Sequence, residues 1–204
     1  MKKFLIALVA LVATATTASA QSWGDLLKSV AGEAATELLD KVTDGAVSEA
    51  VLIGSWNYTA PAAEFEGSNV LSSLGGSAIE SSVTKRLEKA YSYIGITAGA
   101  ATFTFNEDKS FTATLGKIKN LAGTYEYNAE TKEIKLSFSA RSKFNLGTLT
   151  GHAYLNGTSL KLVFPVTKLV NMLKTLGSKI SYLQTITSLL ENYENVYLGS
   201  GFEK

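Results

Sequence analysis

Residues 101–165 alternate between apolar and polar side chains with a period of two, which is typical of β-strands that bury one face. Phe103 and Phe105, for example, alternate with threonines. Short turn sequences separate the runs, and Asn156-Gly157 is a pair that favours a two-residue hairpin. Similar runs flank this region. The pattern predicts strands at 51–58, 101–107, 110–116, 121–128, 132–139, 144–155, 158–165 and 195–202.

The six middle strands follow one another through short turns, which predicts an antiparallel, up-and-down meander. A meander of this length tends to close, because closure removes its exposed edges. The first and last strands can pair to seal it. We therefore predict a mainly β protein, an eight-stranded antiparallel β-barrel with helical insertions. A β-sandwich is the alternative, since alternation alone does not show closure.

An eight-stranded barrel has an interior that side chains fill or that holds one small ligand. The alternation places one set of aromatic and aliphatic side chains on the inward face, where they supply shape and burial. The tyrosine hydroxyls in this set can orient a ligand. The residues predicted to face the interior and to contact a ligand are Trp56, Tyr58, Phe103, Phe105, Phe111, Tyr125, Tyr127, Leu136, Phe138, Leu160, Leu162 and Phe164.

Apolar residues at intervals of three and four predict helices in four further segments. The helix between the first two strands has an apolar stripe that either faces the core or belongs to a movable lid. This helix and the two late ones can cap the open end of the barrel. The predicted helices span 22–44, 69–93, 166–176 and 180–193. Residues 21–50 thus form an N-terminal amphipathic helix or arm, which precedes a barrel domain over 51–204.

The first twenty residues predict a signal peptide. Lys2 and Lys3 precede an uncharged apolar run that is too short for a bilayer, which needs about 20 apolar residues. Ala18-Ser19-Ala20 fits the small-residue pattern before a cleavage site, which predicts cleavage after Ala20. We expect a periplasmic or secreted protein without a transmembrane segment. A lipid anchor is not expected, because no Cys follows the cleavage site.

Composition excludes several kinds of chemistry. The chain has 19 basic and 18 acidic side chains and a net charge of +1, which disfavours a nucleic-acid partner. It has no Cys, so disulfides, thiolate nucleophiles and Cys-based metal sites are excluded. The one His, His152, lies in a predicted strand, and Glu64 and Glu66 form a carboxylate pair beside Pro61. Neither feature has the partners that catalysis needs, so we expect no enzyme activity, no cofactor and no metal.

Several motifs carry a family resemblance. Gly54-Ser55-Trp56, on the first predicted strand, resembles the Gly-x-Trp signature of lipocalins. The resemblance implies that Trp56 plugs the closed end of a barrel. The segment from Gly54 to Glu66, the helix containing Gly75-Gly76, the hairpin at 103–106 and Gly123-Thr124-Tyr125 together resemble a narrower family. Its members are secreted lipocalin-like domains of unknown function from Gram-negative gut bacteria, and the likeness covers about residues 50–204.

Two functions remain open at this point. The first is a binding protein for a small hydrophobic or amphipathic molecule, which needs an interior space near the floor of about 300 Å³ that is typical of ligand pockets, unless a helix opens. The alternative is a structural or protein-interaction module of the cell envelope that uses the barrel as a scaffold. It needs an exposed apolar patch larger than a few hundred Å² on the helices.

Overall fold

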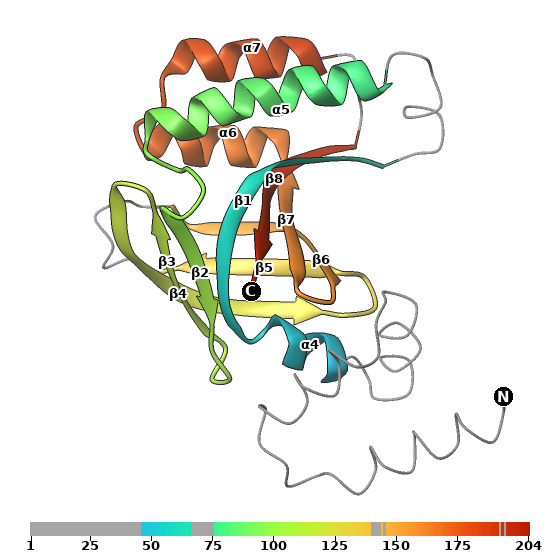
Figure 1. The fold of residues 1–204 in the computed structure, drawn as a ribbon, viewed down its shortest axis with the longest axis vertical. Helices are drawn as coiled ribbons and strands as arrows, with labels where there is room; N and C mark the ends of the chain where they lie inside the picture. The colour runs from blue at the N-terminus through green and yellow to red at the C-terminus, as the bar shows by residue number, and fades with distance from the viewer. Residues whose placement is uncertain (1–45, 67–75, 140–143, 145, 192, 194) are drawn as a thin grey trace, which may run out of the picture.

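The computed structural model describes most of the chain after the N-terminal region (Figure 1). The described residues are 46–66, 76–139, 144, 146–191, 193 and 195–204. The predicted signal peptide, the predicted helix at 22–44 and the first part of the predicted helix at 69–93 lie outside the described residues.

Eight antiparallel strands form a closed barrel in which each strand pairs with its neighbours in sequence. The first and last strands seal it, with Asn57 opposite Glu203 and Phe65 opposite Val196. This confirms the predicted barrel, and the β-sandwich alternative is wrong. The strands are β1 (Gly54–Phe65), β2 (Ala101–Phe105), β3 (Ser110–Leu115), β4 (Ile118–Asn128), β5 (Glu133–Phe138), β6 (Thr148–Asn156), β7 (Ser159–Pro165) and β8 (Val196–Glu203).

The first strand begins and ends later than its sequence pattern predicts. Val51 and Leu52 are instead the last residues of a short helix, α4 (Ala46–Leu52). Leu52 is fully buried in the core, and such tertiary contacts override the strand preference of a β-branched residue such as Val51. Gly54, with φ of 121°, starts β1 instead. The strand then continues through Pro61 to Phe65, and beyond Asn57 it pairs with β8 but not with β2. Pro61 therefore lies on a sheet edge, where its missing N–H is tolerated.

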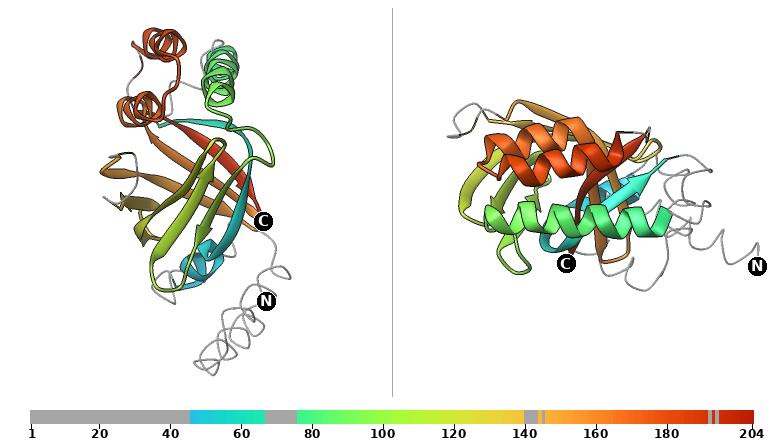
Figure 2. Two further views of the ribbon diagram at one scale, coloured as in Figure 1. Left: turned by 90° about the vertical axis from the view of Figure 1, so that its left-hand side faces the viewer. Right: turned by 90° about the horizontal axis from the view of Figure 1, so that it is seen from above.

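Three helices cover one end of the barrel and α4 lies at the other (Figures 1 and 2). We call α5 (Gly76–Tyr93), α6 (Val166–Thr175) and α7 (Ile180–Leu190) the helical cap. Seen from above, the cap helices lie across the barrel mouth (Figure 2). Their buried apolar residues are Val83, Leu87, Ala90 and Tyr91 on α5, Leu169 and Leu173 on α6, and Leu183, Ile186 and Leu190 on α7. None of the helices within the described ranges has the length and apolar character to cross a membrane.

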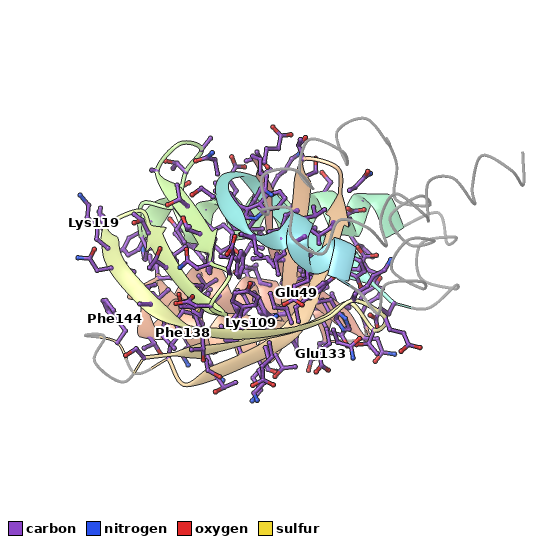
Figure 3. The ribbon with its side chains drawn as sticks, turned by 90° about the horizontal axis from the view of Figure 1, so that it is seen from below. Glu49, Lys109, Lys119, Glu133, Phe138 and Phe144 are labelled. Atoms are coloured by element: carbon purple, nitrogen blue, oxygen red, sulfur yellow. The ribbon has the colours of Figure 1, made fainter. Side chains whose placement is uncertain are left out.

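The opposite end is closed by Trp56. Its side chain is fully buried, and its Nε1–H donates a 2.7 Å hydrogen bond to the carbonyl of Leu52 at the end of α4. The Nζ of Lys204 lies 4.6 Å from the centroid of the Trp56 ring and donates to the carbonyls of Val51 and Ile53. Glu49 of α4 pairs with Lys109 of the β2–β3 turn, seen from below in Figure 3. Trp56 thus lies at the closed end of the barrel, as the family resemblance implies, and its hydrogen bond also joins the barrel floor to α4.

Two glycines allow large rings to pack inside the barrel. Gly123 lies opposite Phe111 on one side and Phe138 on the other, and the two rings meet edge to face at 5.2 Å. A Cβ at Gly123 would lie 2.1 Å from the carbonyl oxygen of Ser137 and 2.8 Å from the Phe111 ring. Gly151 has a comparable position beside Phe164. The aromatic interior therefore depends on the absence of a side chain at these two positions.

Candidate ligand-binding site

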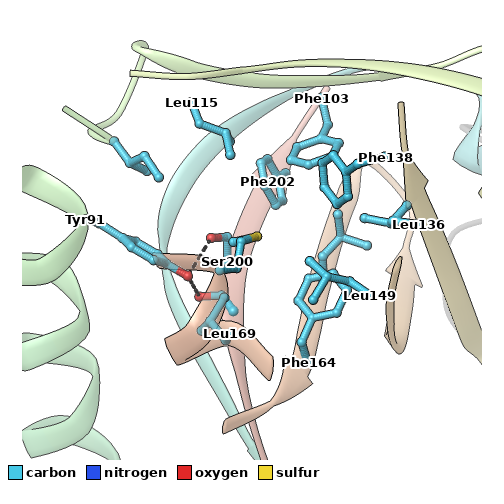
Figure 4. Close-up of a pocket in the computed structure, with 14 residues that line it drawn as sticks. Tyr91, Phe103, Leu115, Leu136, Phe138, Leu149, Phe164, Leu169, Ser200 and Phe202 are labelled. Atoms are coloured by element: carbon cyan, nitrogen blue, oxygen red, sulfur yellow. Dashed lines mark hydrogen bonds between the residues drawn. The ribbon is translucent and has the colours of Figure 1, made fainter. Parts of the chain in front are cut away.

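A small cavity lies where the barrel mouth meets the helical cap (Figure 4). Strand residues form most of its wall, while Tyr91 of α5 and Leu169 and Met172 of α6 close it. Its volume is about 40 Å³, which is far below the 300–1,000 Å³ or so of ordinary ligand pockets. In this closed form the cavity accommodates little more than a few water molecules.

Five of the twelve side chains predicted to contact a ligand line this cavity: Phe103, Leu136, Phe138, Leu162 and Phe164. The other seven pack the barrel elsewhere. They are Trp56, Tyr58, Phe105, Phe111, Tyr125, Tyr127 and Leu160. Ten of the twelve belong to the buried hydrophobic core, and Tyr127 and Phe138, which are partly buried, pack against it.

Aromatic contacts fill the lower part of the barrel. The Phe103 ring lies 5.9 Å from Phe105, 5.8 Å from Phe111 and 5.7 Å from Phe202, measured between ring centroids. Tyr125 meets Phe105 edge to face at 5.0 Å. Such pairs add about 0.5–1.5 kcal/mol each beyond their burial. The lower barrel is therefore a packed core, and free space remains under the cap.

The sequence prediction missed nine residues of the cavity wall. They are Tyr91, Ile96, Leu115, Leu149, Leu169, Met172, Gly199, Ser200 and Phe202. Ser200 and Phe202 of β8 had a usable signal, since they share a face of the strand and alternate with Gly199 and Gly201. The helical residues had none, because a helical stripe shows that a helix packs but not on which part of the barrel.

One wall of the cavity is polar. The Tyr91 hydroxyl donates a 3.0 Å hydrogen bond to the carbonyl of Gly199, and the Ser200 hydroxyl donates to the Tyr91 oxygen at 3.3 Å. Figure 4 shows this pair facing the aromatic side chains Phe103, Phe138 and Phe164. Burial raises the pKa of Tyr91 well above its ordinary value, although the Ser200 hydrogen bond partly opposes this. The phenol therefore stays neutral and keeps its proton for Gly199.

Among the described residues that line the cavity, none carries a charge. Nearby, Tyr58 meets Tyr91 edge to face at 6.0 Å. Burial raises the pKa of Tyr58, and the Glu88 carboxylate on α5 adds to this. The arrangement is an apolar chamber with one neutral polar corner.

The other candidate residues lie on the outer face of the barrel. Glu64 pairs with Lys161 at 2.8 Å, and Glu66 Oε1 lies 3.7 Å from His152 Nε2. The two carboxylates are therefore held by different partners, and neither lines the cavity. Within the part of the chain that the structure describes, no group of His, Asp or Glu side chains is arranged to hold a metal ion.

A closed, antiparallel, eight-stranded barrel with a tryptophan at its floor defines a lipocalin-like protein. The chain belongs to the family of the Lipocalin-like domain (DUF4923), whose model matches residues 25–204. A solved structure with some similarity is a DUF4847 family protein from Bacteroides vulgatus ATCC 8482. It has 14% sequence identity and a TM-score of 0.39, over 77% of this chain and 96% of that one. No curated protein matches the chain.

Proposed function

We propose that this protein is a periplasmic or secreted binding protein for a small hydrophobic or amphipathic molecule, which it holds between the barrel and the helical cap. The cavity at that boundary carries the proposal, since it joins apolar walls to a single polar corner. Ligand sites of this kind combine a mostly apolar lining with a few well-placed polar groups. The predicted signal peptide, with cleavage after Ala20, supports the location.

The surface of the helical cap favours a small-molecule binding protein over a module that recruits a protein partner. Among the described residues, Tyr93 is the one large apolar side chain that is exposed, at 52%. The apolar faces of the cap helices therefore pack against the barrel and against one another. A module that recruits a partner through these helices would need a continuous apolar surface, which a single tyrosine does not supply.

Uptake of a ligand requires the cavity to enlarge. The helical cap can do this without disturbing the strand ladder, because α6 contributes Leu169 and Met172 to the cavity wall but no strand pairing. Methionine is flexible and adapts to different shapes. Peripheral helices open at lower free energy than a barrel unfolds. We infer that the closed form is the ligand-free state and that the helical cap moves when a ligand enters.

Binding of N-phenyl-1-naphthylamine, a neutral dye that fluoresces in apolar surroundings, tests this proposal. Leu169→Ala enlarges the cavity, at a cost of about 2–5 kcal/mol in unfolding free energy. We expect saturable dye binding, strengthened about tenfold in this variant because less displacement of the cap is needed.

Leu121→Ala is the matched control. Leu121 is also a fully buried leucine of the core, but it lies outside the cavity wall. The control should destabilise the protein to a similar extent and leave dye affinity unchanged. Equal gains in both variants would point to general loosening, and absence of binding by the wild type and Leu169→Ala would refute the proposal.

A further inference from the structure

We propose that the ligand is electrically neutral and carries a hydroxyl group, which donates a hydrogen bond to the oxygen of Ser200. This inference rests on the proposed function and specifies the chemistry of the same cavity. It follows from the direction of the hydrogen bonds at the polar corner and from the absence of charge among the described lining residues.

Both hydroxyl protons at the corner already have acceptors. Ser200 gives its proton to Tyr91, and Tyr91 gives its proton to the Gly199 carbonyl. A serine hydroxyl has one proton but two acceptor lone pairs. What Ser200 still offers to a ligand is therefore an acceptor. A ligand group that donates, such as an alcohol, completes the chain, whereas a group that only accepts has to break the Ser200–Tyr91 bond first.

A carboxylate is a poor fit for the same cavity. It brings a full charge and only acceptor atoms, while the described lining residues include no Lys, Arg or His to neutralise it. Moving a charge out of water without a partner is costly. An anionic amphiphile should therefore bind much more weakly than a neutral one of equal chain length.

The remaining wall fits an apolar body. Phe103, Phe138 and Phe164 face the polar corner across the cavity, and Leu149 lies beside them. Leu162 also lines the cavity. A hydrocarbon chain or ring system placed against these side chains gains about 25 cal/mol for each Å² removed from water. The site is thus built for a hydrocarbon body with one hydroxyl end.

Three competitors of equal chain length test the inference by displacing N-phenyl-1-naphthylamine from the full-length mature protein. Decan-1-ol is a neutral donor, methyl decanoate is neutral and only accepts, and decanoate is charged and only accepts. We expect decan-1-ol to bind about three- to tenfold more tightly than the ester, which corresponds to one net hydrogen bond. Decanoate should bind more weakly than both.

Two variants report on the polar corner. Ser200→Ala should abolish the preference for alcohol over ester and leave ester affinity unchanged. Tyr91→Phe should also reduce the preference for alcohol over ester, but by strengthening the binding of the ester. Without the Tyr91 hydroxyl, the Ser200 proton is free to bond with the ester. Ser137→Ala, on the outer face beside Thr148, is the control and should change neither affinity.

The outcomes separate this inference from the proposed function. If the dye binds and all three competitors displace it equally, or if decanoate binds most tightly, the inference is wrong while the proposed function stands. If Ser200→Ala keeps the full preference for alcohol, the inference is also wrong. If neither the wild type nor Leu169→Ala binds the dye, the proposed function fails and this inference falls with it.

Discussion

Replacing Trp56 with Phe tests how the closed end of the barrel is held together. Trp56 is fully buried and donates the 2.7 Å hydrogen bond to the Leu52 carbonyl. The substitution keeps one aromatic ring but removes two buried carbon atoms and the indole N–H. At about 0.8 kcal/mol for each buried carbon, the lost burial amounts to about 1.6 kcal/mol. The carbonyl left without its donor costs about 1–3 kcal/mol more.

We therefore expect Trp56→Phe to lower the free energy of unfolding by about 2.6–4.6 kcal/mol, a large share of the 5–15 kcal/mol or so of a typical domain. Urea denaturation followed by circular dichroism measures this loss. The loss should have a local counterpart, because the missing bond anchors α4. Amide hydrogen exchange should quicken across 46–52 well before the strands lose protection.

Tyr125→Phe is the control for the hydrogen bond alone. The Tyr125 hydroxyl donates a 2.9 Å bond to the Asn106 carbonyl, and the substitution leaves the ring in place. It should cost about 1 kcal/mol and leave exchange in α4 unchanged. If Trp56→Phe costs no more than this control, or if α4 keeps its protection, then Trp56 does not join the barrel floor to α4 in the way described.

Two further predictions concern packing and pH. Gly123→Ala should destabilise the barrel by about 1–3 kcal/mol or more, since the added Cβ would lie 2.1 Å from a backbone atom. Gly157→Ala is the control and should cost only about 1 kcal/mol, because Gly157 has a φ of 57° but open space around it. Urea denaturation midpoints compare the two variants, and equal losses of stability would contradict the predicted clash at Gly123. Burial and neighbouring carboxylates raise the pKa of Tyr154 from 10.0 to about 12, and burial raises that of Tyr91. Because the folded state holds these protons more tightly than the unfolded chain, their stabilisation is complete below pH 10. The contribution of Tyr154 is lost as the pH rises through about 12, and that of Tyr91 at still higher pH. The part of the tyrosinate absorbance that develops last should therefore rise together with the loss of circular dichroism, and ionisation of all nine tyrosines in a folded protein would refute this.

The barrel was predictable from sequence because its main signal is local. Alternation over 101–165 marks which side chains share a face, and short turns leave each strand few partners other than the next one. Pairing of β1 with β8 followed from the same reasoning, since a meander of this length tends to close. The predicted start at residue 51 was wrong for a non-local reason. The core contact of Leu52 and the conformation of Gly54 decide where α4 ends, and neither is visible in a pattern of apolar residues.

The candidate site was only partly predictable. Phe103 and Phe138 were placed on the inward face by alternation, and both line the cavity. Tyr91 and Leu169 were not assigned to the site, because their place under the cap depends on how helices distant in sequence dock on the barrel. The free volume inside the barrel could not be predicted either. A period of two shows that a side chain points inward, but not whether opposing rings meet, as Phe111 and Phe138 do.

The pairing of β1 with β8 has a consequence for how the molecule is made. These strands are separated by almost the whole domain, so the contact that completes the barrel has a high contact order and should form late in folding. Because β8 follows the other seven strands in sequence, the polypeptide has two unpaired strand edges and an aromatic interior open to water until β8 has been made. The domain is therefore vulnerable to aggregation until β8 pairs with β1 and β7, and this pairing is the step that commits the polypeptide to its native state.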